Sequence, residues 1–263
     1  MPVTSVNCQE SPPSVFLAAA WRNLVMLNFA VDPDVLKPLV PVGTELDYFH
    51  GRTFVSIVGF QFLDAALLGI PILFHRAFEE VNLRFYVMRH APEGIRRGVV
   101  FVREIAPKWI VSTIARWVYN EKYVTMPMRH RVEIPTNADC GFVKYEWWHG
   151  GRWNALSAHI HGSPGPLVSG SKEEFIAEHY WGYTMQRDGT TMEYAVEHPP
   201  WQVWQASEPR FDCDVASIYG DAFVPFLREP ASVLVAAGSP VVVRRGRQLQ
   251  TSHCLLPTTA HTG

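Results

Sequence analysis

The sequence predicts one β-rich domain of the α+β class, built as a closed or nearly closed antiparallel barrel or as a sandwich of sheet and helices. Three observations favour this fold class. Most of the chain falls into alternating segments rich in β-branched and aromatic residues, only a few segments have helical spacing, and no long linker divides the 263 residues. Hydrophobic residues make up 48% of the chain, which is enough for one large core.

The first strand is predicted over residues 24–31, and a helix signal follows it. Asp32 is a typical N-cap and Pro33 suits the first helical position, so we expect a short helix before Pro41 and Gly43. The same alternation predicts further strands along most of the chain. They cover residues 54–62, 81–88, 98–105, 141–148, 153–160, 192–198 and 241–244.

Two further helices are expected. Residues 107–119 have apolar side chains at helical spacing. Residues 171–179 open with Ser171 as N-cap and Glu174 three residues later, which is the pattern of a capping box.

Two segments are predicted to be loops. Residues 162–171 are rich in Gly, Pro and Ser, and the apolar residues 65–74 read as a buried loop or a pocket wall. We expect a single domain over residues 1–263. Its core should cover about residues 14–250, because both ends of the chain look loosely ordered.

The charge balance excludes several kinds of partner. A net charge of −2 and a pI of about 6.6 argue against nucleic acid or an anionic membrane surface. No apolar run has the length of a membrane span, and residues 1–23 lack the basic region of a signal peptide. The four cysteines form no CxxC pair and read as independent reduced thiols, so we expect a cytoplasmic protein.

Several segments together resemble the YqjF-like uncharacterised family, domain of unknown function 2071. They span roughly residues 16–245 in order, which makes the resemblance specific. The matching stretches are AAWRNLVMLNFAVDPDVLKPLVP, TFVSIVGFQF, FHRAFEEVNLRFYV, RRGVVFVREIAPKWIVSTIARWVYNEKYV, EEFIAEHYWGY, VEHPPW and PASVLVAAGSPVVV.

This family is similar to the acetoacetate-decarboxylase-like superfamily. The resemblance implies an antiparallel β-barrel or cone with a few peripheral helices around a buried, largely apolar pocket for a small-molecule ligand. It also implies self-association into a homo-oligomer. We expect no cofactor.

The resemblance places a candidate Schiff-base lysine at Lys122. The decarboxylases carry their lysine after a Gly-Phe-Pro turn, whereas the turn here is Tyr119-Asn120-Glu121-Lys122. An imine needs a neutral amine, so the pKa of the lysine must fall through burial or a neighbouring cation. Glu121 is counted with the catalytic candidates, although a carboxylate there favours the charged amine. A solvated or ion-paired Lys122 stays the alternative.

Glu79 and Glu80 begin an apolar strand, where neighbouring residues point to opposite faces. The resemblance makes Glu80 the inward residue, and a carboxyl in an apolar pocket can act as a general acid or base. A buried ion pair with an arginine is the alternative. Asn82 and Arg84 share the face of Glu80, so the three predict a polar stripe suited to a carboxylate or carbonyl ligand.

A second polar group begins near the end of the next predicted strand, at residues 98–105, and continues beyond it. Arg103, Glu104, Arg116 and Tyr119 are candidates for substrate binding, and Arg116 can hold a carboxylate with two hydrogen bonds. The alternative is an Arg–Glu network that fixes a helix to the barrel.

The histidines give weaker signals. His75 is a candidate pocket base. His159 and His161 have a spacing that zinc sites use, but no motif supplies a third ligand, so we expect no metal site.

Two functions follow from these residues. One is a lyase-type enzyme, decarboxylase-, hydratase- or aldolase-like, that acts on an oxo-acid or related carbonyl compound through Lys122 or Glu80. The other is a non-catalytic binding protein for an apolar small molecule. The fold alone does not choose between them.

Overall fold

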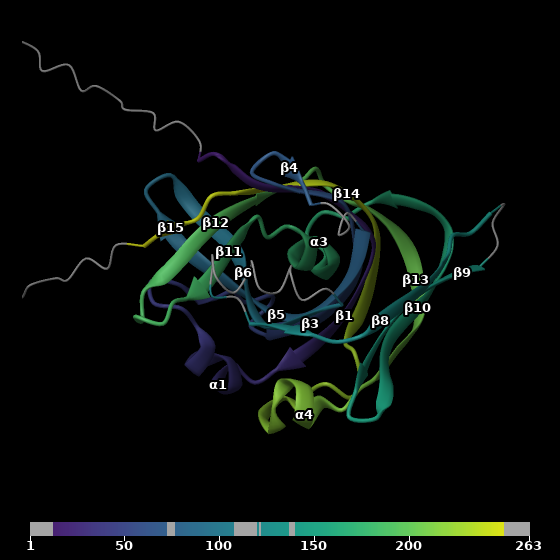
Figure 1. The fold of residues 1–263 in the computed structure, drawn as a ribbon. Coiled ribbons are helices and arrows are strands. Elements are labelled where there is room, and N and C mark those ends of the chain that lie inside the picture. The colour runs from purple at the N-terminus through teal and green to yellow at the C-terminus, as the bar shows by residue number, and fades with distance from the viewer. Residues whose placement is uncertain (1–12, 73–76, 108–119, 121, 137–139, 250–263) are drawn as a thin grey trace, which may run out of the picture.

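The computed structural model describes residues 13–72, 77–107, 120, 122–136 and 140–249 (Figure 1). Strands dominate the described residues, which confirms the β-rich prediction. The strands are β1 Val15–Val31, β2 Glu45–Leu46, β3 Thr53–Leu67, β4 Ile70–Pro71, β5 Ala77–Ala91, β6 Gly94–Ala106, β7 Tyr123–Thr125, β8 Met128–Glu133, β9 Cys140–His149, β10 Arg152–Pro166, β11 Trp181–Met185, β12 Thr191–Glu197, β13 Gln202–Asp212, β14 Ser232–Arg244 and β15 Arg247–Gln248. The helices are α1 Pro33–Leu36, α3 Lys172–Ala177 and α4 Val215–Tyr219, with 3-10 turns at Lys37–Leu39 and Asp221–Phe223.

Seven of these strands form a closed ring in the order β12, β11, β6, β5, β3, β1 and β14. The ring closes where Val196 and Glu197 of β12 pair with Val243 and Val242 of β14. Within the ring only the β6–β11 pair is parallel. From β14 the sheet continues through β13, β10, β9 and β8, which form a second layer against the outside of β1 and β3.

The strands of the ring are apolar on both faces because each face packs against a separate core. Leu24 and Met26 of β1 belong to the core inside the ring. Val25 and Leu27 alternate with them and face the outer layer, where Tyr145 also lies. This two-sided burial accounts for the nearly continuous apolar run of β1.

Helix α3 lies inside the ring, as Figure 1 shows. Ser171 accepts a hydrogen bond of 3.1 Å from the Glu174 amide, so the predicted N-cap is confirmed. The Glu174 carboxylate accepts from the Gly170 amide rather than from Ser171. Phe175 and Ile176 are buried, and they turn the end of α3 into part of the inner core.

Other predictions need correction. The strands are longer than predicted, and residues 162–166, which we expected in a loop, belong to β10, where Gly165 and Pro166 pair with β13. The sequence did not indicate β13. Asp32 caps α1 as predicted. The helix predicted over 107–119 lies outside the described residues from 108 onward.

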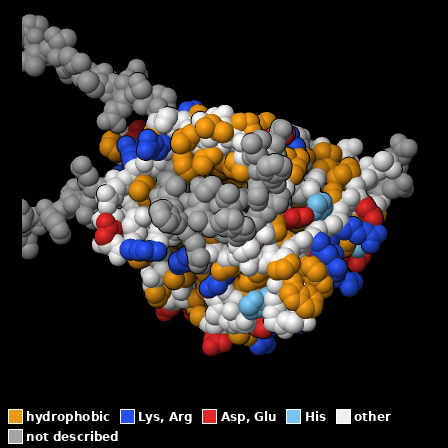
Figure 2. Space-filling view, in the orientation of Figure 1, with side chains coloured by type: hydrophobic (Ala, Val, Ile, Leu, Met, Phe, Trp, Pro, Cys, Tyr) orange, Lys and Arg blue, Asp and Glu red, His pale blue; other side chains and the backbone are white. Residues whose placement is uncertain are grey.

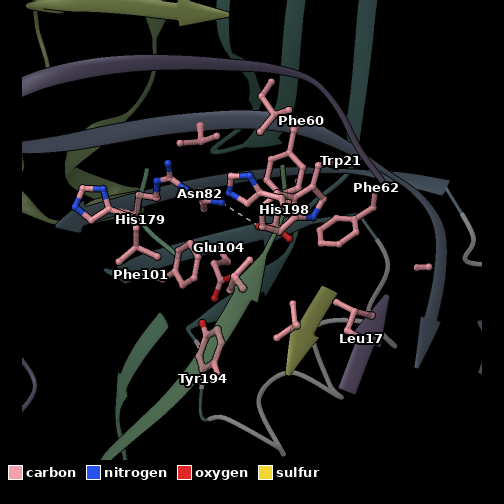
Figure 3. A pocket seen from close by; sticks show the side chains of 18 of the residues that line it. Leu17, Trp21, Phe60, Phe62, Asn82, Phe101, Glu104, His179, Tyr194 and His198 are labelled. Carbon is pink, nitrogen blue, oxygen red and sulfur yellow. Dashed lines mark hydrogen bonds between the residues drawn. The ribbon is translucent and has the colours of Figure 1, made fainter. Parts of the chain in front are cut away.

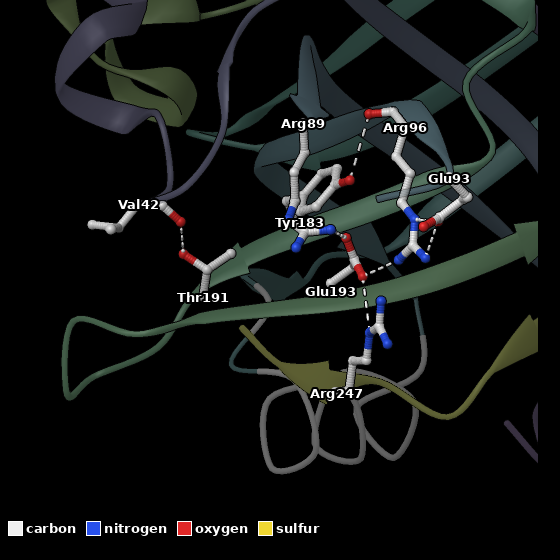
Figure 4. A network of polar contacts seen from close by, with 8 residues as sticks. All are labelled: Val42, Arg89, Glu93, Arg96, Tyr183, Thr191, Glu193 and Arg247. Atoms are coloured by element: carbon white, nitrogen blue, oxygen red, sulfur yellow. Dashed lines mark hydrogen bonds and ion pairs between the residues drawn. The ribbon is translucent and has the colours of Figure 1, made fainter. Parts of the chain in front are cut away.

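A polar network fixes strand β12, which closes the ring (Figure 4). Glu193, whose side chain is fully buried, forms ion pairs with Arg89 at 3.2 Å, with Arg96, and with Arg247 of β15 at 3.1 Å. Arg96 also lies over the ring of Trp181, 3.9 Å from its centroid. One carboxylate thereby joins β5, β6 and β15 to β12.

The described surface is mixed in charge. On the face in Figure 2, acidic and basic side chains are interspersed, and apolar side chains gather at the top of the view, over the β3–β4 hairpin. Leu68 and Ile70 of that hairpin are exposed. Among the described residues, no helix is long and apolar enough to cross a membrane.

Candidate functional site

A cavity of about 150 Å³ lies inside the ring. Its wall is mostly apolar. Strands on all sides of the ring contribute to it, together with Ile72 after β4 and Ala177 at the end of α3. Figure 3 shows part of this wall. The described lining residues are Phe16, Leu17, Trp21, Leu24, Val58, Phe60, Phe62, Ala65, Leu67, Ile72, Phe78, Glu80, Asn82, Arg84, Val99, Phe101, Glu104, Tyr123, Ala177, His179, Trp181, Tyr194, Val196, His198, Trp201 and Val243.

Strand β5 supplies the polar stripe. Glu80, Asn82 and Arg84 all line the cavity and are buried, as strand alternation predicts. Glu79 points to the other face, where its carboxylate lies 2.6 Å from Nδ1 of His130 on β8. Alternation predicted that the two neighbouring glutamates face opposite ways, and the family resemblance made Glu80 the inward one, as the structure has it.

Strand β6 departs from alternation because of a bulge. Leu83 pairs with Arg103, but Arg84 pairs with Phe101, so one extra residue stands in β6. As a result, Phe101 and Glu104 both line the cavity although they are three residues apart. Arg103 is not among the described lining residues, and its charge acts on Tyr219 of α4 on the other side.

Glu80 stands at the centre of a buried hydrogen-bonded group. Its Oε1 accepts from Asn82 Nδ2 at 3.0 Å, and its Oε2 accepts from the Tyr123 hydroxyl at 2.8 Å. Burial raises the pKa of Glu80 to about 7, while the hydrogen bonds from Asn82 and Tyr123 and the charge of Arg84 act to lower it. A carboxyl with this pKa can take or give a proton near neutral pH.

Tyr123 joins two carboxyl groups. Its hydroxyl interacts with both Glu80 and Glu104, each of which is buried. Burial, followed by the charges of Glu104 and Glu80, raises the pKa of Tyr123 well above its ordinary value. Tyr123 therefore keeps its proton and serves as a hydrogen-bond donor. The sequence analysis did not single out Tyr123.

Arg84 is a buried guanidinium at the edge of this group. Its Nη2 donates to the Ile176 carbonyl at 3.4 Å and lies 3.8 Å from Met26 Sδ, while its Nε has no hydrogen-bond partner. Within the described part of the chain, no carboxylate forms an ion pair with Arg84. A buried cation in this position favours an anionic ligand.

His179 adds a site residue that sequence reasoning missed. Its Nε2 lies 3.1 Å from Asp47 Oδ2, and Arg97 Nε donates to the same oxygen at 2.7 Å. Burial lowers the pKa of His179 to about 4, although the hydrogen bond to Asp47 raises it. The imidazole is therefore neutral at pH 7, with Nδ1 buried and without a partner. Asp47 and His179 are 132 residues apart in sequence, and no motif connects them.

The opposite end of the cavity is aromatic. Trp21 packs against Phe60 and Phe62, with ring centroids 5.3 and 6.0 Å apart, and His198 stacks on Trp201 at 4.3 Å and 9°. In Figure 3, Trp21, Phe60, Phe62 and His198 gather on one side of Asn82, and His179 lies on the other. Burial lowers the pKa of His198, so this end is uncharged at neutral pH.

Lys122 stands apart from the cavity. Its side chain is exposed and is not among the described lining residues. Its backbone carbonyl accepts from the Glu104 amide at 3.2 Å, which fixes the start of β7 beside β6. The other predicted site residues, His75, Arg116, Tyr119 and Glu121, lie outside the described residues.

Comparison with known proteins agrees with the predicted family and fold. The model of the DUF2071 family, described as an uncharacterized conserved protein, matches residues 18–240. The uncharacterized protein YqjF of Bacillus subtilis (strain 168) is 25% identical over 193 residues, which cover 71% of this chain and 74% of YqjF.

Solved structures with the same fold include two from the decarboxylase group. An acetoacetate decarboxylase-like enzyme from Sphingomonas wittichii RW1 has a TM-score of 0.63 and 12% identity, over 95% of this chain and 100% of that chain. The acetoacetate decarboxylase of Legionella pneumophila has a TM-score of 0.59 and 11% identity, over 95% and 98%.

A third structure, the enduracididine biosynthesis enzyme MppR complexed with pyruvate, has a TM-score of 0.61 and 14% identity, over 94% and 95%. At these identities the likeness shows the acetoacetate-decarboxylase-like fold.

Proposed function

The chain belongs to the DUF2071 family, and we propose that it is a lyase-type enzyme in which Glu80 acts as general acid and base on a small oxo-acid or related carbonyl compound. The observation that carries the proposal is the buried carboxyl of Glu80, with a pKa of about 7, on the wall of a mostly apolar cavity. A group at that pKa exchanges protons in both directions near neutral pH.

In this proposal, Arg84 binds the carboxylate of the substrate. It is buried on the cavity wall, and its Nε has no hydrogen-bond partner. A carboxylate accepts two parallel hydrogen bonds from a guanidinium, which fixes the plane of the ligand as well as its position.

In this proposal, Glu80 exchanges protons with the carbon next to the substrate carbonyl. Its carboxylate removes a proton from that carbon, the C–H electron pair becomes a C=C bond, and the carbonyl oxygen becomes an enolate oxygen. Aldolase- and hydratase-like reactions proceed from this enolate. In a decarboxylase-like reaction on a 3-oxo acid, the C–C bond to the carboxylate breaks, its electron pair becomes the C=C bond of an enolate as carbon dioxide leaves, and protonated Glu80 returns a proton to the carbon.

The neighbours of Glu80 are positioning residues. Asn82 and Tyr123 each donate to one carboxylate oxygen, so both oxygens of Glu80 are held in place. Glu104 shares the Tyr123 hydroxyl from the other side. No step is assigned to Lys122, since its side chain is exposed. Roles for His75, Arg116, Tyr119 and Glu121 stay predictions, as do a cytoplasmic location and self-association.

Proton exchange tests this proposal directly. The protein is incubated in D₂O with a panel of 2-oxo and 3-oxo acids, and loss of the α-proton signal is followed by NMR. Exchange faster than in buffer alone supports the proposal. Ligand binding without accelerated exchange would favour the alternative, a binding protein for an apolar small molecule, which the apolar wall also suits.

Borohydride trapping examines the imine route separately. The same oxo-acids are added with borohydride, and the intact mass is measured. We expect no adduct on Lys122, because its side chain is exposed and is not among the described residues that line the cavity. A stable adduct on Lys122 would move the chemistry from Glu80 to that lysine.

A further inference from the structure

We infer that the substrate of this cavity carries an aromatic ring, as a 3-aryl-2-oxo acid does, with the ring seated against Trp21, Phe60, Phe62 and His198. The inference rests on the proposed function, because it names the substrate class for the same cavity. It is argued from the order of groups along the cavity, from the rings at one end, and from the size of the space.

Along strand β5, an aromatic ring, a carboxyl group and a guanidinium group follow one another in that order. Phe78, Glu80 and Arg84 follow one another on the face that lines the cavity. Phe78 stacks on Phe62 with centroids 4.8 Å apart and 15° between planes, so it belongs to the aromatic end. Glu80 therefore lies between the aromatic end and the guanidinium of Arg84.

Along β5, Arg84 is the residue of the stripe farthest from Phe78, although its charge also acts on His198. Arg84 lies 5.7 Å from the ring centroid of Tyr86, and His179 lies 4.6 Å from the same ring. A ligand whose carboxylate meets Arg84 thus directs its other end toward Trp21 and Phe62. In a 3-aryl-2-oxo acid, the carbon between the ring and the carbonyl carries the acidic protons, and this order places that carbon at Glu80.

The rings at the aromatic end pack on one another both edge to face and in parallel. Trp21 meets Phe60 at 62° and Phe62 at 88°, whereas His198 and Trp201 are parallel within 9°. Ring faces are electron-rich and ring edges electron-poor, so such a wall attracts another ring more strongly than a saturated group of equal size. Around the whole cavity, Phe, Trp and Tyr make up ten of the 26 described lining residues, whereas they are 13% of the chain.

The cavity volume sets the size of the group. At about 150 Å³, the space matches engineered protein cavities that admit a benzene molecule. One six-membered ring fits a space of this size. Because the aromatic end is neutral, the negative charge of the ligand stays with Arg84.

A matched pair of acids tests the inference without any reaction. Binding of 3-phenylpropanoate and of 3-cyclohexylpropanoate is measured by calorimetry, since the two differ only in the saturation of the ring. We expect the phenyl acid to bind about two- to tenfold more tightly, as aromatic pairing adds to apolar burial. Equal binding, or tighter binding of the cyclohexyl acid, would overturn the inference.

Two variants locate the ring. Trp21→Leu and Phe60→Leu are each expected to bring the ratio of the two affinities close to one, and either suffices if the other does not fold. Trp148→Leu is the matched control, because Trp148 is exposed on β9 and should leave the ratio unchanged. A folded Trp21→Leu or Phe60→Leu protein with the wild-type ratio would contradict this placement.

Proton exchange separates failure of the inference from failure of the proposed function. One outcome is that the protein accelerates α-proton exchange of aliphatic 2-oxo acids by the same factor over buffer as that of phenylpyruvate. In that case the inferred aromatic specificity is wrong and the role of Glu80 stands. If the phenyl acid binds with the expected preference but no oxo-acid exchanges faster than in buffer, the ring site stands and the proposed reaction is wrong.

Discussion

The Tyr123 hydroxyl donates a hydrogen bond of 2.8 Å to Glu80 Oε2 inside the cavity, and the same hydroxyl also interacts with Glu104. This bond stabilises the ionised form of Glu80 against the burial that favours the protonated form. Tyr123 therefore holds the pKa of Glu80 near neutrality, and it links the short strand β7 to the proposed reaction.

Replacement of Tyr123 by Phe should raise the pKa of Glu80 above about 7. A hydrogen bond to a charged group contributes about 1.5–3 kcal/mol, which corresponds to a shift of roughly one to two pH units. The midpoint of the pH–rate profile for proton exchange should move up by that amount. The exposed Tyr48→Phe variant should keep the wild-type midpoint, and an unchanged midpoint in Tyr123→Phe would show that the bond does not tune Glu80.

Glu80 also makes stability depend on pH. Its pKa is raised from 4.5 in the unfolded chain to about 7 in the folded protein, so the folded state retains the proton longer. The stabilisation is fully present below pH 4.5 and is lost as the pH rises through about 7. Relative to Glu80→Gln, wild type should lose on the order of 3 kcal/mol of unfolding free energy over this range. Urea denaturation at several pH values measures this difference in unfolding free energy. The control variant Glu79→Gln should keep the pH dependence of wild type.

His179 should act in the opposite direction. Its pKa falls from 6.5 to about 4 on folding, so its contribution is present above pH 6.5 and is lost as the pH falls through about 4. In wild type this loss partly offsets the gain from Glu80. His179→Phe keeps a ring beside Phe175 and removes the titration, so its stability should fall less than that of wild type between pH 6.5 and 4. Unfolding free energy is measured against pH for both proteins. Curves that run parallel between pH 6.5 and 4 would contradict the lowered pKa of His179.

Arg84 should matter more for binding than for stability, to which it contributes through its charge beside Glu80. Arg84→Met removes a buried cation that has no described carboxylate in ion-pair range, so the unfolding free energy should change less than the binding free energy. The affinity for 3-phenylpropanoate should fall about 10- to 150-fold, which is the loss of a charge-assisted hydrogen bond. Calorimetry measures the change, with the exposed Arg131→Met as control. Unchanged affinity in Arg84→Met would place the carboxylate elsewhere.

Strand alternation predicted the most informative part of the site. The stripe of Glu80, Asn82 and Arg84 follows from period-two alternation once the inward face of β5 is known. The sequence analysis counted both Arg103 and Glu104 as candidates, and only Glu104 is among the described lining residues, because the bulge beside Leu83 and Arg84 shifts the alternation of β6. A bulge of this kind is set by tertiary pairing and has no marker in the local sequence.

The remaining differences have similar causes. β13 escaped prediction because it contains Pro209, and Glu208 before it has a φ of 47° at an irregular pairing with β10. The Asp47–His179 pair depends on the closure of the ring, which brings together residues from distant segments. Lys122 drew attention through family resemblance, yet its side chain is exposed, so resemblance located the segment and not the orientation.

Loss of α-proton exchange in Glu80→Gln is the most direct test of the proposed role of Glu80. Wild type, Glu80→Gln and Glu79→Gln are compared in D₂O with phenylpyruvate and an aliphatic 2-oxo acid at pH 8, where Glu80 is ionised. Glu80→Gln should lose about 10²- to 10⁴-fold of the accelerated exchange, and Glu79→Gln, altered on the opposite face of β5, should retain it. Exchange in a folded Glu80→Gln protein at the wild-type rate would contradict the assignment of Glu80 as the acid–base group.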